Sequence, residues 1–256
     1  MSLSLSDWMA RKKEALGRAA RLDVRNVTPS TRDFTHAVST RRSSLSVVAE
    51  LARATPEEGH LAPMPDYQAI AAALDDTDLA AFAVATDKEV CQGSLPDLTL
   101  VSRATTSPVA QRDLVLVREQ LYQARLAGAD AVLLHAAAVI PADLKAFVEI
   151  AASLHMAAPV EVRTEEEVQV AAAAGARVLV IPAFGHPHAA LSLELANALL
   201  PRVPRALAPL VRGPFYRPEE LEPLRGKADG VWICEPVMRA GDAGAFMREF
   251  LAAAAG

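Results

Sequence analysis

The stretch VVAELARATPEEG, Val47 to Gly59, begins as a short apolar run and then places a carboxylate, Glu50, at the end of that run. A short, continuous apolar run is typical of a parallel strand buried on both faces. Charged residues are almost never fully buried without a partner. Glu50 therefore indicates either a functional site at a strand end or an internal ion-pair cluster, and we favour the functional site.

Seven more short apolar runs follow the first, and helical patterns separate them as strand–loop–helix–loop units require. The eight runs cover residues 45–50, 80–86, 107–112, 130–136, 158–162, 177–183, 206–211 and 229–234. Helical patterns cover residues 67–74, 118–128, 141–154, 164–175, 193–203, 217–226 and 242–255. Strict alternation predicts an α/β protein built as a single (β/α)8 TIM barrel. The alternative, an open doubly wound sheet, would need a G-x-G-x-x-G turn that the sequence does not contain.

The segment before the first strand also has a helical pattern, SDWMARKKEALGRAARLD over residues 6–23. An extension of this length can cover one end of a barrel. We therefore expect one domain over residues 1–256, with residues 1–44 as an N-terminal helical extension.

Composition narrows the class of partner. The 256 residues are 52% hydrophobic and carry a net charge of −5, which argues against nucleic acid as a partner. Cys91 and Cys234 lie far apart in no metal-binding spacing, as in a reduced intracellular protein. Neither a signal peptide nor an apolar run long enough for a membrane span is expected. We therefore expect a cytoplasmic protein with no membrane contact, whose protein partner, if any, the sequence does not identify.

In a (β/α)8 barrel the chemistry lies at the carboxyl ends of the strands. His135 stands on an apolar strand and is either a core histidine or a pocket histidine, whereas Asp87 and Asp113 are expected to cap the helices that follow them. His186 and His188 form an HPH pattern without an identifiable third ligand, so we expect no metal. The strand-end rule selects Glu50, Arg112, His135, Glu161, Arg212, Gly213, Cys234 and Glu235.

Several segments are similar to signatures of one known family. VVAELARATPEEG resembles AE-x-K-x-x-SPS-x-G, PVAQRDL resembles PVLRKDF, and DGVWICEPVMR resembles DAVLIG-x-SLMR. QLYQARLAGADAVLLHAAAV is similar to Q-x-x-EAR-x-x-GADAVLLI. All segments occur in order, so the chain resembles indole-3-glycerol phosphate synthase over nearly its whole length.

The resemblance implies a carbon–carbon lyase of tryptophan biosynthesis. Its reaction closes the ring of 1-(2-carboxyphenylamino)-1-deoxyribulose 5-phosphate and releases CO2 and water. The ligand would be a small molecule, phosphorylated if the family's ligand is kept, and neither the resemblance nor the residues imply a metal or an organic cofactor. The implied catalytic residues are Glu50, Arg112 and Glu161, and the implied substrate-binding residues are Thr55, His135, Arg212, Gly213, Cys234 and Glu235.

Several positions differ from the family pattern. The strand-1 lysine position is Ala52, and the strand-3 lysine position is Arg112, which keeps the charge but is a poor proton donor. Pro182 and Phe184 stand where strand 6 of the family carries asparagine and arginine. The strand-7 motif ESG reads Val211-Arg212-Gly213, and the strand-8 glycine reads Cys234, with a carboxylate next to it that disfavours phosphate. Of the five lysines, only Lys88 is expected near the mouth of the barrel.

Three functions remain open from the sequence. The first is an active indole-3-glycerol phosphate synthase, favoured by ancestry and by both glutamates. The second is a divergent barrel enzyme that acts on another ligand. The third is a non-catalytic paralogue that serves as a binding or regulatory module. The substituted charged positions fit the second and third better than the first.

Overall fold

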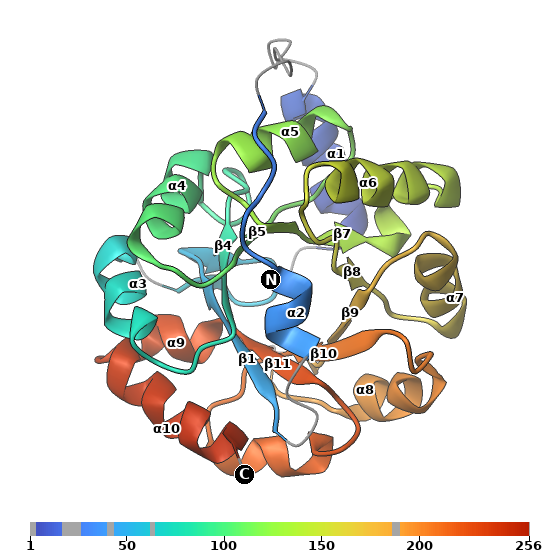
Figure 1. Ribbon diagram of the computed structural model, residues 1–256. Helices are drawn as coiled ribbons and strands as arrows, with labels where there is room; N and C mark the ends of the chain where they lie inside the picture. Colours follow the sequence, from blue (N-terminus) through green and yellow to red (C-terminus); the bar gives the residue numbers. More distant parts are fainter. Residues whose placement is uncertain (1–3, 17–26, 40–43, 62–64, 186–189, 256) are drawn as a thin grey trace.

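Parallel strands close into a barrel surrounded by helices (Figure 1). The computed structural model describes residues 4–16, 27–39, 44–61, 65–185 and 190–255. The sheet order is β6-β5-β4-β1-β11-β10-β9-β8-β7. Its two end strands, β6 (Ala131–Val132) and β7 (Leu134–His135), are consecutive pieces of one segment, so the sheet closes on itself. The predicted TIM-barrel fold is confirmed.

All eight predicted apolar runs form strands of this barrel. The fourth run is split at Leu133, whose amide still donates to the carbonyl of Gln111 in the neighbouring strand. A short antiparallel hairpin, β2 with β3, follows β1 and is separate from the barrel. The remaining strands are β1 (Ser46–Leu51), β2 (Ala54–Thr55), β3 (Gly59–His60), β4 (Ala81–Ala85), β5 (Val109–Arg112), β8 (Val160–Glu161), β9 (Val178–Pro182), β10 (Ala208–Arg212) and β11 (Gly230–Ile233).

The helices largely follow the predicted patterns, with a few differences. The segment predicted over residues 217–226 forms a 3-10 helix over Pro218–Leu224 rather than an α-helix, because Pro223 lies inside it and cannot donate an α-helical hydrogen bond. The short helix α9 was not predicted. A helix with no predicted counterpart, α4, begins after Ser94, whose hydroxyl accepts from the amide of Asp97. The α-helices are α1 (Leu5–Leu16), α2 (Phe34–Ser39), α3 (Tyr67–Asp75), α4 (Leu95–Ala104), α5 (Glu119–Leu126), α6 (Pro141–Ser153), α7 (Glu165–Ala173), α8 (Glu194–Leu199), α9 (Glu235–Arg239) and α10 (Ala243–Ala255), and the 3-10 helices are η1 (Ala136–Ala138), η2 (Leu200–Arg202) and η3 (Pro218–Leu224).

The barrel interior is a compact apolar cluster of mostly small side chains around Trp232. Every second residue of a strand points to the same side, so one alternating set of positions fills this interior. Phe34 and Val38 of α2 belong to the same cluster, and the rings of Phe34 and Trp232 lie 6.4 Å apart. Figure 1 shows α2 lying across the barrel opening. The amino ends of the strands are therefore plugged by apolar residues.

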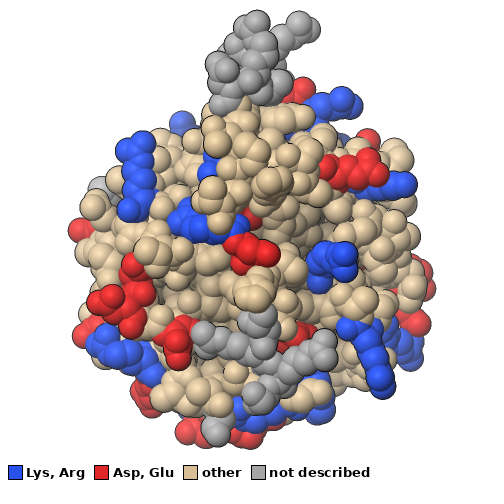
Figure 2. Space-filling view, viewed as in Figure 1, with Lys and Arg blue, Asp and Glu red and all other residues tan. Residues whose placement is uncertain are grey.

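The outer surface around α2 carries both signs of charge. Figure 2 shows Lys and Arg interspersed with Asp and Glu on this face. In the part of the chain that the structure describes, no helix combines the length and apolarity needed to cross a membrane.

Candidate active site at the barrel mouth

Toward the carboxyl ends of the strands, the side chains that point into the barrel change from apolar to polar. Glu50 lies two residues after the interior Val48, and Arg112 lies two residues after the interior Ala110. Strand pairing sets His135 directly opposite Glu161 on the neighbouring strand. This alternation therefore brings the predicted strand-end residues together at one end of the barrel, the mouth.

Glu50 is the central carboxylate of the mouth. Its side chain has 0% exposure, and its two oxygens lie 3.4 Å from Nε of Arg112 and 3.3 Å from Nε of Arg212. The indole nitrogen of Trp232 donates a 2.7 Å hydrogen bond to the same carboxylate. Both arginine side chains are 1% exposed. Glu50 thus acts as the shared counter-charge of two buried guanidinium groups.

A second carboxylate, Glu57, binds the same two arginines from the β2–β3 turn. Its Oε1 lies 3.2 Å from Nη1 of Arg212, and its Oε2 lies 3.6 Å from Nη2 of Arg112. Burial alone would raise the pKa of Glu57, but the two arginines lower it below its usual range. Glu57 is not among the site residues predicted from the sequence. In the resembling signature this position is the second serine of SPS, so a charged residue there was an unused signal.

Glu161 and His135 form a neighbouring pair. Glu161 Oε2 lies 3.7 Å from Nη1 of Arg212, and Oε1 accepts hydrogen bonds from Arg163. Burial opposes ionisation of Glu161, yet His135, Arg163 and Arg212 together lower its pKa to about 2. Burial lowers the pKa of His135 to about 4 despite the nearby Glu161. His135 is therefore neutral at pH 7, and its 3.9 Å contact with Glu161 is not an ion pair there.

The eighth strand of the barrel, β11, leads to Glu235, to whose carboxyl group no arginine of the described residues is bound by a hydrogen bond or close ion pair. Glu235 is fully buried, accepts a 3.3 Å hydrogen bond from the Thr55 hydroxyl on one oxygen, and has no hydrogen-bond partner on the other. Burial raises its pKa to about 7, although Arg212 opposes the shift. Cys234 beside it is buried, and burial raises the pKa of its thiol. The Gly213 amide donates to the Trp232 carbonyl within the sheet.

Helix α1 lies against this mouth. The Trp8 indole nitrogen donates to Asp87 at 3.1 Å, and its ring faces the Arg112 guanidinium, with 5.4 Å between the guanidinium carbon and the ring centroid. The ring also makes an edge contact with His135, with centroids 5.6 Å apart. The N-terminal helix thus contributes an aromatic wall that the sequence alone did not place at the site.

The expectation that only Lys88 would lie near the mouth was wrong, because Lys12 also reaches it. Lys88 is exposed, whereas Lys12 of α1 lies 3.0 Å from Asp87 and 2.5 Å from Asp113. Asp113 therefore pairs with Lys12 instead of capping a helix, and α5 begins only at Glu119. The Trp8 to Lys12 spacing of four residues places both side chains on one helix face, a signal that was present in the sequence.

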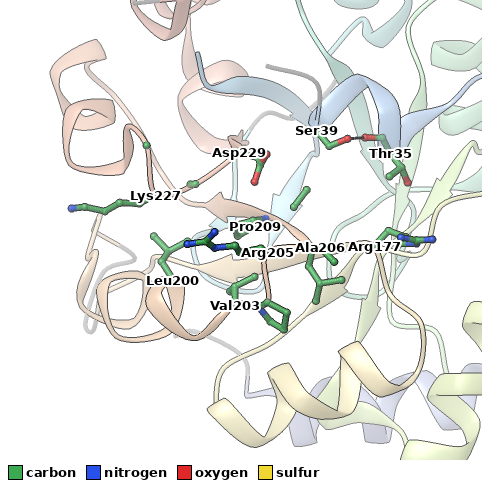
Figure 3. A pocket seen from close by; sticks show the side chains of 15 residues that line it. Thr35, Ser39, Arg177, Leu200, Val203, Arg205, Ala206, Pro209, Lys227 and Asp229 are labelled. Carbon is green, nitrogen blue, oxygen red and sulfur yellow. Dashed lines mark hydrogen bonds between the residues drawn. The ribbon is translucent and has the colours of Figure 1, made fainter. Parts of the chain in front are cut away.

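A separate cavity of about 660 Å³ lies at the other end of the barrel (Figure 3). Thr35 and Ser39 of α2 line it together with Arg177, Arg205 and Lys227. It contains none of the predicted site residues. His186 and His188, considered above as metal ligands, lie outside the residues that the structure describes.

The structure places eight of the nine predicted site residues at or directly after the carboxyl ends of the barrel strands, and Thr55 on the hairpin that follows β1. Glu50, Arg112, Arg212, Glu161 and His135 make one cluster, and Thr55 with Glu235 makes a contact beside it. This arrangement defines the class of protein: a (β/α)8 barrel whose mouth holds a buried cluster of paired acidic and basic side chains.

Sequence comparison shows the family. Residues 5–250 match the family described as indole-3-glycerol phosphate synthase. The chain is 32% identical over 214 residues to the indole-3-glycerol phosphate synthase of Mycobacterium leprae, covering 83% of the chain and 79% of the relative. It is 32% identical over 249 residues to that of a Parafrankia species, covering 97% and 92%. The chain belongs to the indole-3-glycerol phosphate synthase family, so the predicted family of tryptophan biosynthesis is confirmed.

Comparison with solved structures agrees on the fold alone. The thiamine phosphate pyrophosphorylase of Pyrococcus furiosus superimposes with a TM-score of 0.62 at 18% identity, covering 83% of this chain and 96% of that one. A mutant tryptophan synthase alpha-subunit from the same organism gives 0.61 at 15% identity, covering 82% and 99%.

Proposed function

We propose that the chain is a divergent family member that binds a small anionic ligand at the barrel mouth and does not carry out the family's ring closure. The observation that carries this proposal is the pairing of Arg112 with carboxylates. Arg112 ends β5, the third strand of the barrel, where the family has a lysine. Arg112 is held between Glu50 and Glu57, and its Nη1 lies 3.0 Å from the Cys91 sulfur. Burial opposes its charge, but these neighbours keep the pKa of Arg112 above its usual value. A guanidinium that holds its proton this firmly cannot act as a general acid.

No side chain of the described residues replaces the family's other lysine as a proton donor. Ala52, at the strand-1 lysine position, is fully buried and has no charge. Lys12 is the lysine that does reach the mouth, and two aspartates hold its ammonium group. Burial lowers the pKa of Lys12, but Asp113 and Asp87 raise it above its usual value, so it too retains its proton. Loss of a general acid alone costs about 10²–10⁴-fold in rate.

The mouth still has a group suited to proton transfer. Glu235, with a pKa of about 7, is partly protonated at neutral pH and can donate or accept a proton there. Glu161, with a pKa of about 2, stays ionised and is a weak base at that pH, so it supplies a fixed negative charge. Surroundings that separate the pKa values of two carboxyl groups give them different roles in this way. Arg112 and Arg212 supply the positive charge that an anionic ligand needs.

Growth of a tryptophan auxotroph that lacks its indole-3-glycerol phosphate synthase tests the loss of ring closure. We expect no growth without tryptophan when this chain is expressed, whereas the Mycobacterium leprae relative from the same promoter should restore growth. Immunoblotting would check that both proteins accumulate equally. Growth supported by this chain at normal expression would overturn the proposal.

A binding module without turnover is the second candidate, because both mouth arginines are already paired with carboxylates of the chain itself. Incubation with the family's substrate, followed by mass spectrometry, separates the two candidates. Conversion to a product other than indole-3-glycerol phosphate favours the divergent enzyme. Binding with complete recovery of the substrate favours the module.

A further inference from the structure

The two mouth arginines are bound by carboxylates of different origin. Glu50 stands on strand β1, is 0% exposed, and contacts the Nε edge of each guanidinium. Glu57 stands on the turn between β2 and β3, is 16% exposed, and contacts the terminal Nη atoms. Among the carboxylates that pair with both arginines in the described structure, Glu57 is the one that a loop rather than a strand supplies. Its carboxylate can leave the mouth without any change in the barrel strands.

The Nη atoms of two adjacent arginines make a natural carboxylate site. Guanidinium groups present paired N–H donors whose geometry matches the two oxygens of a carboxylate. Glu57 uses this geometry: its Oε1 and Oε2 lie 3.2 and 3.4 Å from the two terminal nitrogens of Arg212. Without an anion here, Arg212 would keep Glu50 and Glu161, but Arg112 would share Glu50 with Arg212, and its terminal nitrogens would face no other carboxylate of the described residues. A buried guanidinium that is only partly paired is unfavourable, so an anion at this position stabilises the mouth.

We infer that Glu57 is an internal, displaceable occupant of a carboxylate-binding site formed by Arg112 and Arg212, and that a small organic monocarboxylate is the ligand that replaces it. The inference rests on the proposed function in one respect, namely that the mouth binds an anionic ligand. It adds the class of that ligand and a residue that limits its affinity. Each time a ligand carboxylate enters, the Glu57 carboxylate moves out to solvent, so the number of charges at the mouth is conserved.

Charge favours a carboxylate over a phosphate. A monocarboxylate replaces the single negative charge of Glu57 by another single negative charge. A phosphate dianion would instead add a second negative charge next to Glu50 and Glu235. Glu50 is fully buried and cannot move away from it, and Glu235 is fully buried as well. The Gly213 amide, which could otherwise face a phosphate, is already bonded to the Trp232 carbonyl.

Titration calorimetry of the full chain with benzoate tests the inference, because benzoate carries one carboxylate and no phosphate. The variant Glu57→Gln removes the competing charge and keeps the length of the side chain. We expect it to bind benzoate at least about tenfold more tightly than the unmodified chain, since the ligand no longer displaces an ion pair. Inorganic phosphate, titrated at the same ionic strength, should gain less than benzoate.

The matched control is Glu58→Gln. Glu58 lies on the same turn but pairs with Arg239 at 2.7 Å. The benzoate affinity of the Glu58→Gln variant should therefore differ from that of the unmodified chain by less than about twofold. Unchanged benzoate affinity in a folded Glu57→Gln variant would overturn the inference, and a larger gain for phosphate would overturn the ligand class. If Glu57→Gln does not fold, Glu57→Asp keeps the charge but shortens its reach, and it should tighten benzoate binding to a smaller extent; no change would again overturn the inference.

The outcomes are distinguishable from those of the proposed function. Restored growth of the tryptophan auxotroph would overturn the loss of ring closure but would leave the ratio of benzoate affinities unaffected. Equal benzoate affinities of Glu57→Gln and the unmodified chain would show that Glu57 does not compete with the ligand, but they would say nothing about ring closure.

Discussion

At the residue scale, Arg212 is the most connected charge in the mouth. It pairs with Glu50, Glu57 and Glu161, and its guanidinium carbon lies 4.8 Å from the ring centroid of Phe184. Buried ion pairs add little net stability, because removing both charges from water costs about as much as their attraction returns. Removing one partner is different, since it leaves the other charges buried and unpaired.

Replacing Arg212 by Met tests this asymmetry. The substitution keeps an unbranched side chain but removes the charge shared by three carboxylates. We expect the free energy of unfolding, measured by urea titration at pH 7, to fall by about 3–5 kcal/mol. The control is Arg217→Met: Arg217 is 75% exposed and pairs with Glu220 within one helical turn, so a change below about 1 kcal/mol is expected. Similar losses in both variants would contradict the role of Arg212.

Individual site residues were predictable where they stand on strands. Glu50, Arg112 and Glu161 follow from the rule that polar residues at the carboxyl ends of barrel strands face the mouth. Glu57 and Trp8 did not follow, because each reaches the mouth through a contact between distant parts of the chain: Glu57 lies 155 residues from Arg212, and Trp8 lies 79 residues from Asp87. A pattern of neighbouring residues cannot show a contact between residues so far apart in the sequence.

At the element scale, the strands were predicted better than their connections. Continuous apolar runs identified all eight strand positions, since strands buried on both faces leave a clear signal. The Pro223-containing segment was mistaken for an α-helix because its hydrophobic spacing is helical, whereas proline blocks the α-helical hydrogen bond. The packing of α1 on the mouth depends on contacts of Trp8 and Lys12 with Asp87 and Asp113, in the loops that follow β4 and β5, and helix periodicity cannot show such contacts.

The loop from β4 to α4 connects the strand end to the mouth and is packed closely at Gly93. A Cβ added to Gly93 would lie 2.0 Å from the Ala85 carbonyl oxygen. The same loop carries Asp87, which binds Lys12, and Cys91, which contacts Arg112. A shift of this loop would therefore reach the candidate site.

Gly93→Ala should lower the free energy of unfolding by about 1–3 kcal/mol, because backbone atoms of a strand must move to admit the methyl group. Gly241→Ala is the matched control, since a Cβ at Gly241 meets no atom within 4 Å. Glycine replacement at such an open position changes stability little or raises it by less than about 1 kcal/mol. Urea unfolding of both variants makes the comparison. Equal effects would show that the loop is not held against Ala85.

At the scale of the whole molecule, the two ends of the barrel are closed in opposite ways. Phe34 and Val38 of α2 plug the amino ends with apolar packing, whereas the carboxyl ends enclose a cluster of charges under Trp8. An apolar mouth of the same volume would be at least as stable, because buried charge clusters are seldom more stabilising than hydrophobic packing. The cost of keeping these charges favours a role in ligand binding over a role in stability.

The opposite pKa shifts in the mouth predict how the stability of the whole protein depends on pH. The pKa of Glu161 is lowered to about 2, so the stability that this ionised group contributes is present above its ordinary pKa of 4.5 and is lost as the pH falls toward 2. The pKa of Glu235 is raised from 4.5 to about 7, so the folded state holds this proton more tightly than the unfolded state. Its contribution is complete below pH 4.5 and is lost as the pH rises through 7.

His135 acts in the opposite direction over much of the same range. Its pKa is lowered from 6.5 to about 4, so its contribution to stability is present above pH 6.5 and is lost as the pH falls through 4. The contributions of Glu235 and His135 therefore offset each other between about pH 5 and pH 6.5, and the Glu235→Gln variant separates them.

Relative to the unmodified chain, the free energy of unfolding of the Glu235→Gln variant should rise on the order of 3 kcal/mol between pH 5 and pH 8, because the fall caused by Glu235 is absent. For the exposed Glu249→Gln variant, the difference from the unmodified chain should stay nearly constant over this range. Urea unfolding of the three proteins from pH 3 to pH 8 measures the effect, and a pH-independent difference for Glu235→Gln would show that Glu235 is not the group that titrates.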